Sequence, residues 1–251
     1  MNSPVILSIE TATLAGSTWL GAGDVELTTR VGDPAVSQST SLLNDINEVL
    51  SEAGVQLSDV DLFCCASGPG SFTGLRIGIA TLKGLAAPLN RPCLGIPTLA
   101  AVAHAAGPSE ATVALLPAGR GEVFAQLFAV SAERIVSELD APAHLAPAAL
   151  MKRYANITRL KWAGPGAHLH RDLIESEARN SNIAFSEAWI DPLASLSGEV
   201  FWQLTQNEAN LSRHVAALAL QAYAKNELQS PHSLSAIYVR PSDAELNQKC
   251  Q

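Results

Sequence analysis

An apolar stretch that ends in a Gly-Pro-Gly loop and resumes at helical spacing places the strongest constraint on how this chain can fold. Residues 62–66 are apolar, glycine and proline fill positions 68–70, and residues 72–87 place apolar side chains at helical spacing. Glycine permits tight loops, and Ser71 and Thr73 are residue types that cap helix N-termini. The pattern therefore predicts a strand, a tight loop and a helix.

Two interpretations of this loop stay open. Gly68, Gly70, Ser71 and Thr73 are candidates to contact an anion, because a glycine-rich loop before a helix aims backbone N–H groups outward. The same glycines could serve only the close packing of a strand-to-helix turn, and the pattern alone favours this second interpretation. No Gly-Lys-Ser/Thr follows, and the spacing differs from that of a dinucleotide fingerprint.

The whole-chain composition indicates a soluble, cytoplasmic protein. The 251 residues are 47% hydrophobic and 16% charged, with a formal net charge of −8, so the chain lacks the basic excess that drives nucleic-acid binding. Its cysteines, Cys64, Cys65, Cys93 and Cys250, show no CxxC spacing, which is typical of free thiols in a reducing compartment. We find no apolar run long enough to span a membrane and no signal peptide.

The first half of the chain reads as three strands followed by alternating helices and strands. We expect strands at 5–9, 17–20 and 25–31, a helix at 36–53, a strand at 61–66, a helix at 72–87, a strand at 93–96 and a helix at 98–106. This order is the pattern of a ribonuclease-H-like lobe with a mixed central sheet.

The second half repeats that order. We expect strands at 111–116, 122–130 and 134–139, a helix at 147–154, a strand at 160–163, and helices at 167–177, 193–208 and 211–227. Gly164-Pro165-Gly166 stands where Gly68-Pro69-Gly70 stands in the first half, 96 residues further along the chain. Because the element order repeats with the tripeptide, we infer a duplicated lobe.

The predicted fold is therefore α/β, with two ribonuclease-H-like lobes of the actin, sugar-kinase and Hsp70 class. The expected ranges are 1–107 for the N-terminal lobe with the glycine loop, 108–210 for the C-terminal lobe, and 211–251 for a C-terminal helix and tail that pack back on the lobes.

Three sequence segments closely resemble the TsaB (YeaZ) family: VILSIETAT near the N-terminus, SGPGSFTGLRIGIATLKGLA in the middle and GRGEVFAQLF at 119–128. The resemblance implies a non-catalytic scaffold and activator in the formation of tRNA N6-threonylcarbamoyladenosine. Its partner would be a TsaD-like catalytic subunit, which modifies the adenosine 3′ of the anticodon. A TsaE-like ATPase would join through the complex, tRNA would be contacted only indirectly, and the chain alone would form a homodimer.

The resemblance also implies that the helices at 36–53 and 72–87 form the dimer contact. The interface residues we expect are Leu42, Leu43, Ile46, Leu50, Leu75, Arg76, Ile79 and Lys83. The second of these helices is apolar nearly all round and needs burial on both sides, although a central helix of one core would satisfy the same pattern. We expect Ile79→Asp to abolish association and to leave the lobe folded.

Neither lobe presents the carboxylates of a phosphotransfer site. Glu10 stands where relatives have Asp, and Pro117 to Arg120 stand where relatives commonly have Asp-Ala-Arg, although Arg120 could meet a phosphate or a carboxylate of a partner. We therefore expect no cofactor bound by this chain alone, and a nucleotide only at an interface of the complex.

The histidines and cysteines predict no catalytic site either. No two of the six histidines are four residues apart, the spacing that places two metal ligands on one helix face. Cys64 and Cys65 lie in the middle of a strand, where burial leaves thiols unreactive. Two alternatives stay open: a small-molecule kinase or hydrolase of the actin-like class that uses Glu10 and the glycine loop, and a divergent homodimeric paralogue.

Overall fold

The computed structural model describes residues 3–187 and 200–239, which form two compact units. The first unit contains the residues up to Ala101 together with Ala209–Tyr238, and the second begins at Val102 and ends at Glu208, with Val239. The chain thus changes unit at 101/102 and 208/209, where the sequence predicts 107/108 and 210/211.

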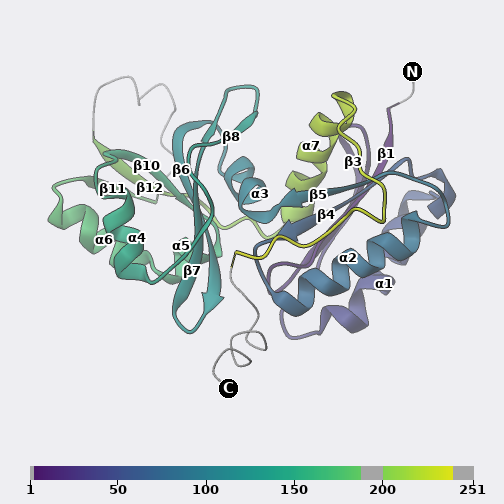
Figure 1. Ribbon diagram of the computed structural model, residues 1–251, viewed down its shortest axis with the longest axis horizontal. Helices are drawn as coiled ribbons and strands as arrows, with labels where there is room; N and C mark the ends of the chain where they lie inside the picture. Colours follow the sequence, from purple (N-terminus) through teal and green to yellow (C-terminus); the bar gives the residue numbers. More distant parts are fainter. Residues whose placement is uncertain (1–2, 188–199, 240–251) are drawn as a thin grey trace. The chain divides into compact units, whose positions relative to one another are not determined.

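A mixed five-stranded sheet forms the centre of the first unit (Figure 1). Its strands, in spatial order, are β3 (Val25–Val31), β2 (Ser17–Ala22), β1 (Val5–Glu10), β4 (Leu62–Gly68) and β5 (Cys93–Pro97). Strands β1 to β3 pair antiparallel, whereas β4 and β5 run parallel to β1. This is the predicted meander followed by parallel strands.

Helices cover both faces of this sheet. They are α1 (Gln38–Ala53), α2 (Phe72–Ala86) and α7 (Leu211–Ala224), with a short 3-10 turn at Leu57–Asp59 and with α3 (Thr98–Ala105) at the junction with the second unit. Successive side chains of β1 point to opposite faces of the sheet, which explains the helix layer on each face. Leu7 packs with α1 and α2 on one face, whereas Ile6 packs with α7 on the other. The helix expected at 211–227 therefore lies on the sheet of the first unit.

The second unit repeats the same topology. Its strands, in spatial order, are β11 (Ala184–Ser186), β12 (Phe201–Leu204), β10 (Arg159–Ala163), β6 (Ser109–Gly119), β7 (Glu122–Val130) and β8 (Val136–Glu138), and β9 (Ala143–Leu145) also pairs with β7. Again the first three strands pair antiparallel, and the later ones run parallel to the first. The prediction of two ribonuclease-H-like lobes of the actin-like class is confirmed.

The core of the second unit lies between its sheet and the helices α4 (Pro147–Tyr154), α5 (Pro165–Leu169) and α6 (Arg171–Asn180). Trp162 and Trp202 are fully buried there with their ring centroids 5.1 Å apart, as expected of core tryptophans. Gly164 follows β10 directly, as Pro69 and Gly70 follow β4.

Parts of the second-half prediction were wrong. The helix expected at 193–208 is contradicted at 201–204, which form β12, and its first residues, like Trp189 and Cys250, lie outside the described residues. The helix expected at 167–177 is two helices that meet at His170, and β9 and β11 were not predicted. Over the described ranges, the structure contains no helix that is both long and apolar enough to cross a membrane.

Candidate functional site

The glycine loop joins β4 to α2 as predicted, and Ser71 caps the helix. The Ser71 Oγ accepts a hydrogen bond from the backbone N–H of Gly74 at 3.2 Å, and the Ser71 carbonyl accepts one from Leu75 at 2.8 Å. A helix N-terminus leaves such donors without helical partners. The cap therefore explains why α2 begins at Phe72.

Glycines allow α2 to lie directly on the turn that follows β1. A Cβ atom on Gly70 would lie 2.6 Å from the carbonyl oxygen of Ala12. A Cβ atom on Gly74 would lie 1.9 Å from the carbonyl oxygen of Thr11, and one on Gly78 would lie 2.2 Å from the Thr11 Oγ1. No side chain fits at these distances, so the close approach of helix and turn requires glycine.

The backbone donors of the loop are partly used within the chain. The Gly68 N–H donates to the Thr98 Oγ1 at 3.1 Å, and the Ser71 N–H donates to the Ala12 carbonyl at 2.8 Å. These contacts support the packing interpretation of the loop. An anion contact by Gly68, Gly70, Ser71 and Thr73 stays a prediction.

A C-terminal strap, which we define as residues 229–238, covers the loop. The sequence predicts a tail that packs back on the lobes but not these contacts with β5 and the glycine loop. Gln229 pairs with Cys93 at the start of β5, and the Ile237 N–H donates to the Ser67 carbonyl at 2.7 Å. Leu234 is only 2% exposed and belongs to the core beside α1 and α2. In Figure 1 the strap is the yellow segment that runs along β5 and β4 toward the start of α2.

Glu10 is the last residue of β1, and its side chain holds the turn that follows. Its carboxylate is fully buried and accepts hydrogen bonds from the backbone N–H of Thr13 at 2.7 Å and from the Thr13 hydroxyl at 2.5 Å. Burial raises the pKa of this carboxyl group, and the bonds from Thr13 oppose that rise. The sequence predicts a strand that ends at Ile9, whereas β1 includes Glu10, whose side chain bonds to the turn that follows.

The corresponding turn of the second unit is a tight hairpin between β6 and β7. Gly119 pairs with Glu122, and Gly119, Arg120 and Gly121 all have positive φ, between 53° and 78°. Two-residue hairpin turns need such backbone angles. Arg120 is exposed at the tip, and its contact with a phosphate or a partner stays a prediction.

Five of the eight expected interface residues lie in the core of the first unit. Their side chains are at most 8% exposed, and they are Leu42, Ile46, Leu50, Leu75 and Ile79. Leu43 is 57% exposed, Arg76 is exposed and Lys83 is half-buried. A partner that docks on α1 and α2 would therefore meet these last three residues and not the buried five.

The expected effect of Ile79→Asp changes accordingly. Ile79 packs in the same cluster as Ile46 and Leu82, so an aspartate there would bury a charge without a counter-ion. We now expect this variant to unfold the first unit, which makes it unsuitable as a test of association.

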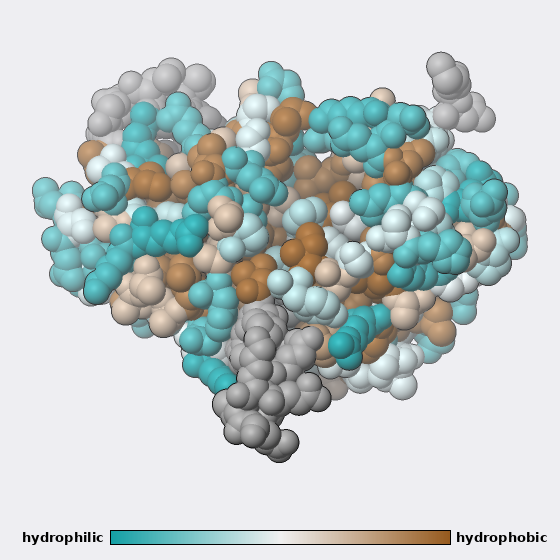
Figure 2. Space-filling model, in the orientation of Figure 1, coloured by the Kyte–Doolittle hydropathy of each residue, from teal (hydrophilic) through white to brown (hydrophobic). Residues whose placement is uncertain are grey.

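The accessible surface of α1 and α2 is chemically mixed. Figure 2 shows hydrophilic and hydrophobic residues interspersed over these helices rather than one continuous apolar patch. At the start of α2 the Arg76 guanidinium lies 3.8 Å from the centroid of the Phe72 ring, and Tyr238 of the strap packs on the same ring at 5.2 Å. This stack ties the strap to the outer surface of the helix.

Cys64 and Cys65 are buried in β4 as predicted. Cys64, Cys65 and Cys93 are free thiols within the core. Burial raises the pKa of Cys64 to about 12 and that of Cys93 to about 11. Over the described residues, no cluster of His, Cys, Asp and Glu has the geometry to hold a metal ion.

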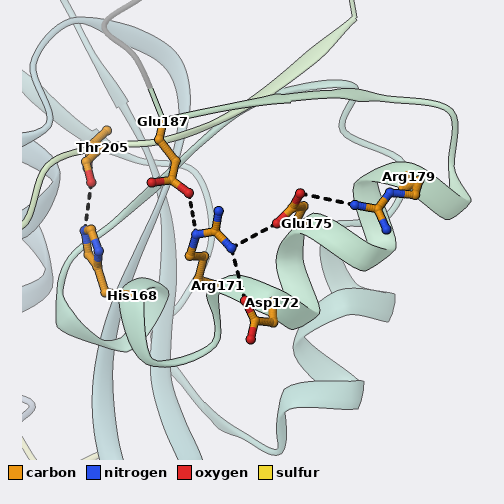
Figure 3. A network of polar contacts seen from close by, with 7 residues as sticks. All are labelled: His168, Arg171, Asp172, Glu175, Arg179, Glu187 and Thr205. Atoms are coloured by element: carbon orange, nitrogen blue, oxygen red, sulfur yellow. Dashed lines mark hydrogen bonds and ion pairs between the residues drawn. The ribbon is translucent and has the colours of Figure 1, made fainter.

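The charged network around α6 has a structural role (Figure 3). Arg171 contacts Glu187, Asp172 and Glu175, the last at 3.0 Å, and Arg179 contacts Glu175 at 3.2 Å. His168 shares a hydrogen bond of 2.8 Å with the Thr205 carbonyl. Exposed ion pairs of this kind add little stability each, and the network links α6 to the end of β11.

The fold and these sites can be compared with known proteins. The family model described as tRNA N6-adenosine threonylcarbamoyltransferase (TsaD) matches residues 36–241. The chain is 35% identical over 127 residues to the tRNA threonylcarbamoyladenosine biosynthesis protein TsaB of Escherichia coli, and this match covers 47% of this chain and 52% of that protein. It is 38% identical over 86 residues to TsaB of Haemophilus influenzae, and this match covers 33% of this chain and 36% of that protein. The chain thus spans about half or less of the curated relatives it matches.

Among solved structures, the chain is similar to YeaZ from Pseudomonas aeruginosa. The TM-score is 0.70 at 24% identity, and the match covers 94% of this chain and 99% of that one. This likeness is one of fold.

Proposed function

Because this chain belongs to the TsaD family of tRNA N6-adenosine threonylcarbamoyltransferases, within its TsaB (YeaZ) branch, we propose that it is the non-catalytic partner of a TsaD-type subunit. In this role it stabilises and activates the subunit that forms N6-threonylcarbamoyladenosine in tRNA. A TsaE-like ATPase joins through the complex, and tRNA is contacted only indirectly.

The non-catalytic part of this proposal rests on the burial and hydrogen bonding of Glu10. A catalytic carboxylate needs a free oxygen that faces substrate or metal. In this chain both carboxylate oxygens of Glu10 accept bonds from Thr13 of the following turn, and the group is fully buried. The alternative of a kinase or hydrolase that uses Glu10 would require this turn to open.

The accessible parts of α1 and α2 support the choice of contact surface. Leu43 is a large apolar side chain exposed in the middle of α1, and Arg76 and Lys83 lie on α2. An exposed leucine gains free energy when a partner covers it, about 1.5–3 kcal/mol for full burial. We propose that the same surface forms a homodimer when the chain is alone.

Sedimentation equilibrium tests the proposal. The purified chain is measured alone and in a mixture with the TsaD-type subunit of the same organism, with and without ATP and the TsaE-like protein. We expect a homodimer that is replaced by a mixed complex. A homodimer that persists under every condition would favour the divergent paralogue and would overturn the partner role.

Two matched leucine variants locate the contact. Leu43→Asp and Leu169→Asp both place a charge at an exposed position, since Leu43 is 57% and Leu169 is 62% exposed, but Leu169 lies in the second unit. We expect Leu43→Asp to weaken association by about tenfold or more and Leu169→Asp to leave it unchanged. Equal effects of the two variants would remove α1 from the contact surface.

A further inference from the structure

The second unit contains a cavity of about 490 Å³ at one end of the strands of its sheet. It is the end at which β6, β10 and β12 begin, since Ser109, Arg159 and Phe201 all contribute to the cavity lining. Ligands of open α/β sheets usually bind beyond the carboxyl ends of the strands. This cavity lies at the opposite, amino ends and is therefore separate from the glycine loop that follows β10.

Two cationic side chains of β10 line this cavity. Arg159 and Lys161 are two residues apart in a strand and therefore point to the same face, whereas Trp162 points into the core. The neighbouring strand β12 places Phe201 opposite Arg159 and Gln203 opposite Lys161. The cavity wall is thus formed by a row of cationic, aromatic and amide groups.

The charge of Arg159 is not neutralised by any described residue. Its guanidinium lies 6.0 Å from the Phe201 ring centroid, and no carboxylate in residues 3–187 and 200–239 forms an ion pair with it. The acidic residue of the lining, Glu110, is exposed to solvent. An anion inside the cavity would therefore meet a half-buried cation that has no carboxylate partner among the described residues.

Lys161 adds a second, positioned charge. Its Nζ donates hydrogen bonds to the carbonyls of Ala106 at 3.1 Å and Pro108 at 2.9 Å, which leaves one of its three N–H groups for a ligand. Burial lowers the pKa of Lys161, and the nearby charge of Arg134 lowers it further. A bound anion would relieve the repulsion between these cations.

From this juxtaposition we propose that the cavity binds a small organic anion. Arg159 and Lys161 hold its carboxylate or phosphate group, and Phe201 and Ile135, which line the same cavity, contact its apolar body. The volume lies within the range of about 300–1,000 Å³ that is typical of small-molecule sites. This binding is independent of the proposed partner role, because it needs only this chain.

Amide resonances of the isotope-labelled full chain provide the test. Benzoate, phenyl phosphate and inorganic phosphate are titrated separately, with benzamide as the neutral match of benzoate. We expect saturable shifts for residues at 109–111, 129–137, 159–161 and 201–203 with benzoate or phenyl phosphate, and at least about tenfold weaker binding of benzamide. The ratio of benzoate to phenyl phosphate affinity shows which anionic group the site prefers.

Variants test whether Arg159 binds the anionic group of the ligand. We expect Arg159→Gln to weaken binding by about tenfold or more and Arg179→Gln, a change of the exposed arginine on α6, to have no effect. If Arg159→Gln fails to fold, Ser137→Trp replaces it, because Ser137 is an exposed lining residue and the indole would fill the cavity. No saturable shift at millimolar concentrations, equal binding of benzamide, or binding that survives these variants would overturn the proposal.

Discussion

Replacement of Gly74 by alanine tests whether the glycines of α2 exist for packing. The added Cβ would lie 1.9 Å from the carbonyl oxygen of Thr11, whereas real Cβ contacts are essentially never under 3.0 Å. The helix or the turn must therefore move by more than about 1 Å. Gly84 lies in the same helix, is exposed and has nothing within 4 Å of its added Cβ, so Gly84→Ala is the matched control.

The expected change in stability follows from two opposing effects. Alanine in place of glycine stabilises a helix by up to about 1 kcal/mol, and both variants share this gain. Overpacking against a rigid neighbour costs about 1–3 kcal/mol, and only Gly74→Ala incurs it. We therefore expect Gly74→Ala to be about 1–3 kcal/mol less stable than Gly84→Ala.

Urea unfolding followed by circular dichroism measures this difference. Hydrogen exchange of the α2 amides reports on the first unit by itself, because the two units need not unfold together. If Gly74→Ala is as stable as Gly84→Ala, glycine is not needed for the contact with Thr11, and the packing argument fails. The anion interpretation of the loop would then regain support.

Three further predictions concern the buried groups. Since burial raises the pKa of Glu10, the folded state binds its proton more tightly than the unfolded state does. The unfolding free energy of the unsubstituted chain, measured by urea titration relative to that of Glu10→Gln, should therefore fall as the pH rises from about 4.5 to 7. A difference between the two chains that does not change with pH would contradict this. Leu234→Ala should lower the unfolding free energy by about 2–5 kcal/mol and make the strap accessible to limited proteolysis, because this buried leucine anchors it. An unaltered cleavage pattern would show that this leucine does not anchor the strap. In a Cys250→Ser variant, the three buried thiols should resist iodoacetamide at pH 8 until urea is added, and rapid labelling of the native chain would refute their burial.

The elements of the first unit could be predicted well because their patterns are local. Alternation along β1, the helical spacing of α1 and α2, and the loop at 68–70 each appear within a few residues of sequence. The duplicated topology followed from the same signals, with the second Gly-Pro-Gly as the link. In each case the burial pattern and the turn chemistry indicate the same element.

The remaining elements depend on contacts that a local pattern does not contain. In β12, Trp202 and Leu204 face the core while Gln203 is also buried on the other face, so the strand shows no clear alternation. The strap is held by the pairing of Gln229 with Cys93, more than a hundred residues away in sequence. Such pairings become visible only in the folded chain.

The candidate interface shows a related limit. Apolar side chains at helical spacing mark the face of a helix that is buried, but the spacing does not say what covers that face. Leu42, Ile46 and Ile79 were assigned to a partner, and the structure places them against the sheet of their own unit. Leu43, which departs from the core stripe of α1, is the better marker of an outer contact.

The rate of tRNA modification by the TsaD-type subunit tests the central proposal most directly. The subunit of the same organism is assayed with its substrates and the TsaE-like ATPase while this chain is added in increasing amounts. We predict that the rate of N6-threonylcarbamoyladenosine formation rises, saturates at a fixed ratio of the two subunits, and is zero with this chain alone. A rate that does not respond to the chain, or modification by the chain without the TsaD-type subunit, would contradict the account.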